Sequence, residues 1–186
     1  MLSNKIKEET KEAHLNLEKK VVQKMKAIRS DADYADFLKH FYAYFSQVEK
    51  AIAPYITKEL LPDLAERRNS SHIKEDIEAL GSNVDELPEA ESPEINNAIQ
   101  ALSALYVMEG SIMGGPIIVK MLEKFGISTG FSFFSGYGAE TGQMWGKFAA
   151  VLNANANNEE EEQQAIDTAN ETFSKFGEVF GEVNVA

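Results

Sequence analysis

The stretch that decides the fold runs from Ser3 to Met25 and reads SNKIKEETKEAHLNLEKKVVQKM. A helix with about 3.6 residues per turn gathers its apolar positions into one stripe. This stripe consists of Ile6, Thr10, Ala13, Leu17 and Val21. His14 lies on the flank of the stripe, so the helix offers an imidazole to the interior. The pattern predicts one amphipathic helix from Ser3 to about Met25.

Charged side chains share the flank on which His14 lies. Lys7, Lys11 and His14 are spaced i, i+4 and i+7, and Glu18 stands one turn beyond His14. We expect Glu18 to accept the Nδ1 proton of His14, which leaves Nε2 free to bind a metal. The alternative is an ordinary half-buried histidine that pairs with a carboxylate four residues away.

Composition and charge narrow the class of protein. A chain of 186 residues is long enough for one domain with a full core, so we expect a single domain over residues 1–186. A net charge of −12 repels nucleic acid phosphates and anionic membranes. The lack of cysteine excludes disulfides, thiolate-held zinc, iron–sulfur clusters and cysteine nucleophiles. No apolar run looks long enough for a signal peptide or a membrane span, and we expect a cytoplasmic protein.

Helical spacing continues along most of the chain, and sustained strand alternation is missing, so the predicted fold class is all-α. One helix is expected from about Asp33 to Ala53, where Pro54 ends or bends it. His40 falls off its apolar face and is expected at the surface. The residues of that face are Tyr34, Phe37, Phe41, Tyr44, Phe45, Val48 and Ile52.

Two further helices are predicted from their end signals. A short one spans about His72 to Leu80, with Ser71 as N-cap and Gly81 as the stop. The C-terminal helix begins near Asn158. Its first turn carries four glutamates, which suit the positive end of the helix dipole and indicate a capping feature rather than a metal site.

The second informative stretch begins at Ser92, an N-cap with Pro93 at the first helical position, and leads into Gly110-Ser-Ile-Met-Gly-Gly-Pro116. In a helix interior, three glycines at about 1 kcal/mol and one proline at about 3 kcal/mol would cost about 6 kcal/mol. We therefore expect the helix to stop at Gly114 and a new one to start with Pro116. The glycines also remove side chains, so that something flat can approach the backbone. A plain kink or a close helix crossing is the alternative.

Together these two stretches indicate a kind of ligand. A planar ligand with a central metal, an apolar body and anionic substituents would match a histidine on one side, bare backbone on the other and lysines at the rim. Haem fits that description. Placing the two helices opposite each other is here an inference from chemical complementarity.

Both stretches resemble a known family. Ile6–His14, with the sequence IKEETKEAH, closely resembles the start of haem oxygenases, and Gly110–Gly115 resembles their glycine-rich, kinked distal helix. The form of Tyr106–Gly115 looks more like the bacterial enzymes associated with bacteriophytochromes than the animal ones. The resemblance covers nearly the whole chain. It implies a multi-helix bundle with haem between the proximal first helix and the kinked distal helix.

The resemblance also implies a reaction and a set of roles. Haem b, both substrate and cofactor, is opened to biliverdin, CO and iron with O2 and electrons from a ferredoxin-like protein or a reductase. A phytochrome is the receiver of biliverdin that the resemblance suggests. When the roles known in the family are transferred to the matching positions, His14 is the proximal iron ligand and Glu18 its hydrogen-bond partner. The other implied site residues are the propionate contacts Lys7 and Lys11, the distal backbone of Gly110, Gly114 and Gly115, the pocket aromatic Phe173, and Lys147 as the nearest candidate for a later propionate contact.

Ser111 departs from the animal members, in which an aspartate organises the distal water. A hydroxyl can hold a water but offers no fixed charge. The alternative function is therefore a haem-binding or haem-buffering protein of the same fold that does not turn haem over. A third reading is a catalytically silent interaction bundle. A di-iron bundle would need Glu-x-x-His helices, and the thiamin-degrading relatives of this fold need a cysteine; the sequence has neither.

Overall fold

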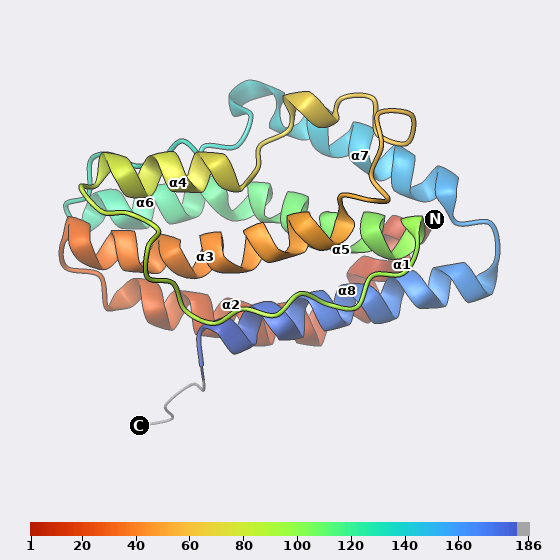
Figure 1. Ribbon diagram of the computed structural model, residues 1–186, viewed down its shortest axis with the longest axis horizontal. Helices are drawn as coiled ribbons and strands as arrows, with labels where there is room; N and C mark the ends of the chain where they lie inside the picture. Colours follow the sequence, from red (N-terminus) through yellow and green to blue (C-terminus); the bar gives the residue numbers. More distant parts are fainter. Residues whose placement is uncertain (182–186) are drawn as a thin grey trace.

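The computed structural model describes residues 1–181, and the regular structure in that part of the chain is entirely helical (Figure 1). The prediction of an all-α fold is confirmed. The α-helices are α1 (Leu2–Glu9), α2 (Lys11–Lys26), α3 (Asp31–Ile52), α4 (Ser70–Ala79), α5 (Ala98–Gly110), α6 (Gly115–Lys124), α7 (Thr141–Asn155) and α8 (Glu159–Val179). The 3-10 turns are η1 (Leu64–Glu66), η2 (Ser111–Gly114) and η3 (Gly138–Glu140).

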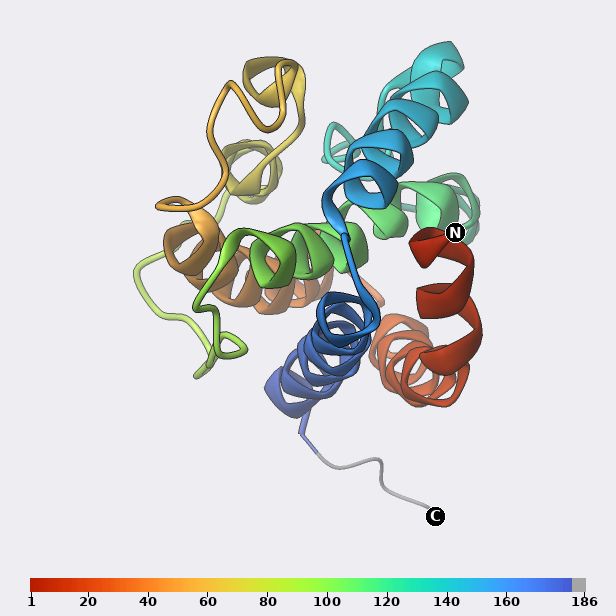
Figure 2. The same cartoon turned by 90° about the vertical axis from the view of Figure 1, so that its right-hand side faces the viewer.

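Helix α5 runs through the middle of the bundle and packs against α3, α7 and α8 (Figures 1 and 2). Every residue from Ala101 to Glu109 is buried. A helix that is apolar on all sides must be surrounded by other elements to remain in water. Helix α5 is therefore the central helix of the bundle, and α3, α7 and α8 pack around it.

The segment from Ala98 to Lys124, which contains α5, η2 and α6, is long and apolar enough to cross a membrane. The expectation that no apolar run reaches that length is therefore wrong. More than half of its most apolar part is buried inside the fold. For α5, the position at the centre of the bundle gives a sufficient reason for the apolar composition.

Helices α3 and α8 follow the predicted patterns closely. All seven residues of the predicted α3 face are buried, and the α8 N-cap Asn158 accepts a hydrogen bond from the Glu161 amide at 2.9 Å. His40 differs from the prediction. It is half-buried, because its ring stacks on Phe180 with 5.3 Å between the ring centroids.

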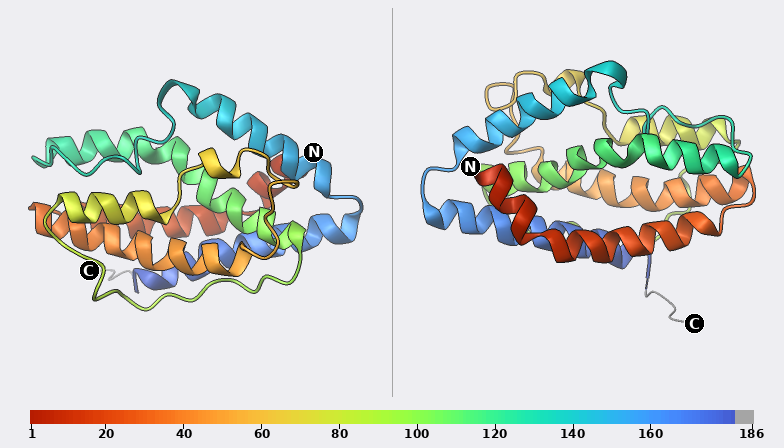
Figure 3. Two further views of the ribbon diagram at one scale, coloured as in Figure 1. Left: turned by 45° about the horizontal axis from the view of Figure 1, so that its top comes forward. Right: turned by 180° about the vertical axis from the view of Figure 1, so that it is seen from behind.

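The predicted first helix is broken into two at Thr10, where φ is −108° and ψ is 6°. The Thr10 hydroxyl donates to the Ile6 carbonyl at 2.6 Å. A threonine hydroxyl that bonds to the preceding turn competes with regular helix geometry and bends the chain. Helix α1 therefore turns away from the axis of α2 (Figure 3).

Two predicted helix starts are displaced. The helix expected from Ser92 begins at Ala98, where Asn97 accepts from the Gln100 amide at 2.9 Å. Residues 83–97 instead form an extended segment across α3 and α8 (Figure 1), as the residue before a proline prefers an extended backbone. Helix α4 is capped by Asn69 rather than Ser71, and Gly81 ends it with a φ of +82°.

The predicted change of helix at the second stretch is confirmed. Helix α5 ends at Gly110, the 3-10 turn η2 follows, and α6 starts at Gly115 with Pro116 in its first turn. Helix α5 ends four residues before the predicted stop at Gly114, and α6 starts one residue before the predicted Pro116. Gly110, Gly114 and Gly115 have φ values of −60°, −87° and −54°, which any residue adopts. Their backbone angles therefore do not require glycine.

Candidate functional site

A cavity of about 390 Å³ lies between the α1–α2 segment on one side and α5 with η2 on the other. It brings together five predicted residues from distant parts of the chain. These are Lys7, His14, Gly110, Ser111 and Phe173. The other lining residues are Thr10, Leu17, Tyr106, Val107, Met113, Trp145 and Phe176.

His14 stands on α2 at one wall of this cavity. Its ring stacks on Phe173 of α8, with 5.3 Å between centroids and 22° between the planes. In the part of the chain that the structure describes, neither ring nitrogen of His14 has a hydrogen bond. The imidazole is therefore held by an aromatic contact, and its nitrogens are available to a ligand.

Glu18 does not hold His14 in the way the helical spacing predicted. Its side chain is exposed, and no hydrogen bond joins it to His14 among the described residues. The i, i+4 spacing puts the two side chains on one face of α2, but the His14 ring leans onto Phe173 and α8. The orienting contact of His14 in this structure is therefore Phe173.

The predicted lysines are divided by the helix break at Thr10. Lys7, on α1, lines the cavity, whereas Lys11, the first residue of α2, does not. On a continuous helix the two would share one flank, but the bend changes their relative direction. Lys147 is exposed on α7 and also lies outside the lining.

The three predicted glycines have different surroundings. Gly110 lines the cavity, and an added Cβ would meet only the Trp145 ring, at 3.8 Å. At Gly114 a Cβ would have no neighbour within 4 Å, and this residue is outside the lining. A Cβ on Gly115 would lie 2.0 Å from the Phe134 carbonyl oxygen. The close crossing of α6 with another chain segment therefore accounts for the glycine at position 115, which does not line the cavity.

The sequence did not predict six aromatic or apolar residues of the cavity lining as site residues: Leu17, Tyr106, Val107, Met113, Trp145 and Phe176. Tyr106 and Met113 lie four residues before and three residues after Gly110, so helical spacing alone places them on the face of Gly110. Helical spacing from Gly110 could therefore have identified Tyr106 and Met113 from the sequence. Trp145 comes from α7, packs against Tyr106 with 5.2 Å between centroids, and has no such local signal.

Arg68 lies behind Gly110–Gly115, the distal segment, and was not predicted as a site residue. It is buried, and its Nη2 donates to the Ser111 hydroxyl at 2.5 Å and to the Met108 carbonyl at 3.0 Å. Its Nη1 donates to the Phe133 carbonyl at 3.0 Å, and the guanidinium lies 4.2 Å from the centre of the Phe133 ring. Burial lowers the pKa of Arg68 to about 10. The Ser111 hydroxyl therefore has a fixed positive charge beside it, which the sequence reading had taken to be missing.

A buried ion pair between Arg67 and Glu109 anchors the end of α5. Arg67 donates from Nη1 to the Glu109 carboxylate at 2.9 Å, and both side chains are 2% exposed. Arg67 also binds Asp63 through Nε and Nη2, at 2.9 Å each, and Tyr137 donates to Glu109 at 3.0 Å. Burial raises the pKa of Glu109, against the lowering effect of the two arginines and Tyr137. Because its charges are paired, this cluster fixes α5 without exposing an unpartnered charge.

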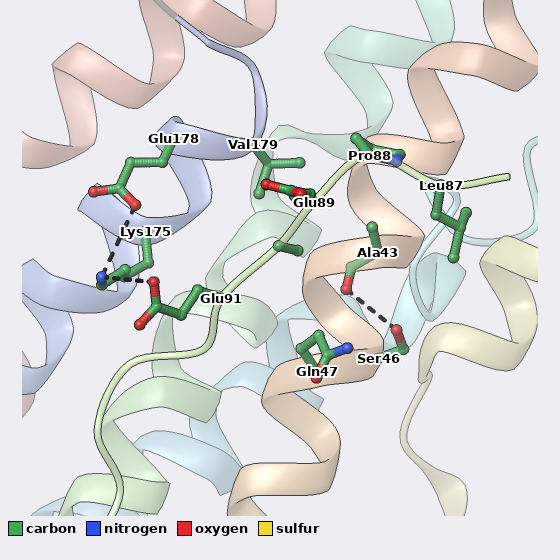
Figure 4. A pocket seen from close by; sticks show the side chains of 11 residues that line it. Ala43, Ser46, Gln47, Leu87, Pro88, Glu89, Glu91, Lys175, Glu178 and Val179 are labelled. Carbon is green, nitrogen blue, oxygen red and sulfur yellow. Dashed lines mark hydrogen bonds and ion pairs between the residues drawn. The ribbon is translucent and has the colours of Figure 1, made fainter.

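A larger hollow, of about 690 Å³, lies elsewhere, where residues 87–91 cross α3 and α8 (Figure 4). Its lining combines three glutamates, Glu89, Glu91 and Glu178, with one lysine and with small or apolar side chains. Its lysine, Lys175, is engaged with Glu91 at 3.3 Å and Glu178 at 3.9 Å. None of its lining residues is a histidine, and none belongs to the predicted site. Size alone therefore does not identify the functional cavity, and we assign it to the one that His14 lines.

The chemistry of the donor set fits a haem better than a bare metal ion. No group of three or more His, Asp or Glu side chains within residues 1–181 could hold a metal ion. A haem brings four iron ligands of its own and needs only one axial histidine from the protein. The apolar walls and Lys7 match its ring and one of its carboxylates.

Comparisons with known proteins agree with this geometry. The family model described as "Heme oxygenase" matches residues 1–182. Heme oxygenase PigA from Pseudomonas aeruginosa is 28% identical over 172 residues, which cover 91% of this chain and 86% of that protein. A heme oxygenase from Xanthomonas campestris is 28% identical over 149 residues, with 78% and 88% coverage. The NO- and CO-bound heme oxygenase from Neisseria meningitidis has a similar fold, with a TM-score of 0.78, 23% identity, and 100% and 95% coverage.

Proposed function

Because the chain belongs to the haem oxygenase family, we propose that it binds haem b in the cavity between α2 and α5 and opens it to biliverdin, CO and iron. Bound haem supplies the iron that activates O2 and is itself the molecule that is oxidised. The observation that carries this proposal is that His14 and Ser111, 97 residues apart in sequence, line one apolar cavity.

His14 is the proposed axial ligand of the haem iron. The Phe173 ring against its face restricts the rotation of the imidazole, which lines the cavity. This role is usually filled by a hydrogen bond to the second ring nitrogen. Here packing against Phe173 supports His14, and the Glu18 side chain stays exposed to solvent.

Lys7 is the proposed contact for a haem propionate. Its side chain is exposed at the edge of the cavity, where an ammonium can meet a carboxylate without losing its own hydration. A contact of this kind contributes more to the orientation of the ligand than to its affinity. Lys11 and Lys147 are weaker candidates, because neither lines the cavity.

Ser111 is proposed to orient a distal water. A hydroxyl has one proton and two lone pairs. Its proton goes to the Met108 carbonyl at 2.7 Å, and one lone pair accepts from Arg68. The remaining lone pair can accept a hydrogen bond from a water in the cavity, which leaves the second O–H of that water free to donate toward the substrate. Ser111 thus directs a proton donor, and the charge of Arg68 favours release of that proton.

The remaining proposals concern partners and location. Electrons must come from another molecule if they pass through an iron–sulfur cluster, because the chain has no cysteine to hold one. We therefore propose a separate ferredoxin-like protein or a reductase as donor. A phytochrome as receiver of biliverdin and a cytoplasmic location stay predictions from the sequence.

The test is a hemin titration followed by a single reductant-driven turnover in O2. We expect a Soret band on adding hemin, then loss of that band with biliverdin in the chromatogram. A Soret band that persists under reductant and O2, without biliverdin, would favour the haem-buffering alternative. A protein that gives no Soret band at all would be the silent bundle, and the proposed function would be wrong.

A further inference from the structure

Asp76 lies on α4, outside the cavity, and is 4% exposed. We propose that this carboxylate is a positioning residue that sets the distal segment Gly110–Gly115 for haem turnover, acting through the turn at Phe131–Ser135. The inference rests on the proposed function for its effect on turnover. Its structural part, the placement of the distal segment, stands on contacts in the protein alone.

The first step is the set of hydrogen bonds by which Asp76 holds the backbone of the turn. Its Oδ1 accepts from the Ser132 amide at 3.1 Å and from the Ser132 hydroxyl at 2.7 Å. Its Oδ2 accepts from the Phe133 amide at 2.9 Å. A buried carboxylate that accepts three hydrogen bonds holds the backbone of a turn more firmly than a neutral acceptor would.

The second step leads from the turn to the distal hydroxyl. The Phe133 carbonyl accepts from Nη1 of Arg68 at 3.0 Å, and the Phe133 ring lies beneath the guanidinium. Nη2 of the same guanidinium donates to Ser111. Because a guanidinium is planar and rigid, a displacement of its Nη1 partner also displaces Nη2. The position of Phe133 therefore determines the hydrogen bond that Ser111 receives.

The third step is a steric contact on the next residue of the turn. The Phe134 carbonyl oxygen fills the space that a side chain on Gly115 would occupy, 2.0 Å from the ideal Cβ position. The turn is thus in close contact with the first residue of α6, just after η2. Asp76 reaches the distal segment from both sides, through Arg68 at Ser111 and through Phe134 at Gly115.

The variant that tests the inference is Asp76→Asn, which keeps the size of the side chain. An amide has one acceptor oxygen, so if it serves Ser132, its NH2 group faces the Phe133 amide, donor against donor. The matched control is Glu49→Gln. Glu49 accepts from the amide and the hydroxyl of Ser70, at 2.6 Å each, and so anchors the start of the same helix but not the turn.

Two measurements separate the two parts of the inference. Hydrogen exchange of the haem-free protein reports on the peptide that contains residues 110–116, and we expect faster exchange there in Asp76→Asn than in Glu49→Gln. In the haem complex, we expect Asp76→Asn to lower the rate of biliverdin formation about tenfold while the hemin dissociation constant changes less than about threefold. General destabilisation, which Glu49→Gln also causes, is not expected to lower the rate of biliverdin formation while the hemin dissociation constant stays nearly unchanged.

The outcomes are distinguishable. Equal exchange and equal turnover in the two variants would overturn the inference. If wild-type protein binds hemin without forming biliverdin, the proposed function fails, and the exchange data still decide whether Asp76 positions the distal segment. If Asp76→Asn does not fold, Ser132→Ala replaces it. This variant removes one of the three hydrogen bonds, and unchanged exchange in residues 110–116 would then overturn the inference.

Discussion

The guanidinium of Arg68 donates a hydrogen bond to the hydroxyl of Ser111, and these two residues are 43 positions apart in the chain. Ser111 faces the cavity, whereas Arg68 lies behind it and is buried among backbone carbonyls. A neutral side chain on the distal wall is thereby connected to a fixed charge. The site has the charge that a serine alone would lack.

Replacing Arg68 by Lys is expected to impair turnover more than haem binding. A lysine ammonium cannot reach the three acceptors that the planar guanidinium joins, so at least one of these charged hydrogen bonds is lost. A hydrogen bond from a charged donor contributes about 1.5–3 kcal/mol of stability. Urea unfolding of the haem-free variant and single-turnover kinetics of its haem complex check both effects. Wild-type turnover in Arg68→Lys would show that Ser111 does not need this partner.

His14→Ala is expected to remove the axial ligand and leave the fold intact. His14 is exposed to the cavity, so its loss costs little core packing apart from the contact with Phe173. We expect an altered Soret band and no biliverdin, with a thermal midpoint close to that of wild type. Added imidazole should restore part of the normal spectrum, since it can occupy the space vacated by the side chain. A wild-type haem spectrum in the variant would exclude His14 as ligand.

Charge reversal at the two lysines separates the effect of the cavity from the effect of net charge. Lys7→Glu should weaken hemin binding and give a mixture of biliverdin isomers, because an attractive contact with a propionate becomes repulsive. Lys11→Glu makes the same change in net charge outside the cavity and should have a much smaller effect. Chromatography of the biliverdin isomers checks both variants. Equal effects would mean that general electrostatics, rather than contact, guides the haem.

The elements that the sequence predicts well are those with local signals. Periodic apolar residues locate α3 and α8, and the unusual cluster of glycines marks the end of α5. His14 and Ser111 can be proposed because each belongs to such a local pattern. The break at Thr10 is harder to predict, since a threonine on the apolar stripe is compatible with a continuous helix until its hydroxyl bonds to Ile6.

Contacts between distant segments are beyond the reach of these local signals. Arg68 looks like a surface arginine in a polar stretch, and only the packing of α5 and of the Phe131–Ser135 turn around it gives it buried partners. In the same way, Phe173 rather than Glu18 supports His14, because the packing of α8 against α2 decides where the imidazole leans. Gly115 belongs to this group too, as its reason is a carbonyl from another segment.

The glycines of the distal segment allow a prediction that separates a structural cause from a functional one. Gly115→Ala should destabilise the haem-free protein strongly, because its methyl group would lie 2.0 Å from the Phe134 carbonyl oxygen and the backbone must shift to avoid it. Gly114→Ala has open space around the new methyl group and a helical φ, so the haem-free protein should be unchanged or gain up to about 1 kcal/mol from helix propensity. Thermal and urea unfolding of the two haem-free variants measure this difference.

Gly110→Ala adds the functional half of the comparison. The methyl group fits against Trp145 at 3.8 Å, so the haem-free protein should tolerate it, but it would project into the cavity where haem is proposed to bind. We expect near-normal stability with impaired hemin binding or turnover in Gly110→Ala, and a smaller effect in Gly114→Ala because that residue is outside the lining. If Gly110→Ala binds and opens haem as wild type does, the glycine is not there to make room for the ligand. The distal face of the site would then have to be sought along Tyr106 and Met113, which line the same cavity.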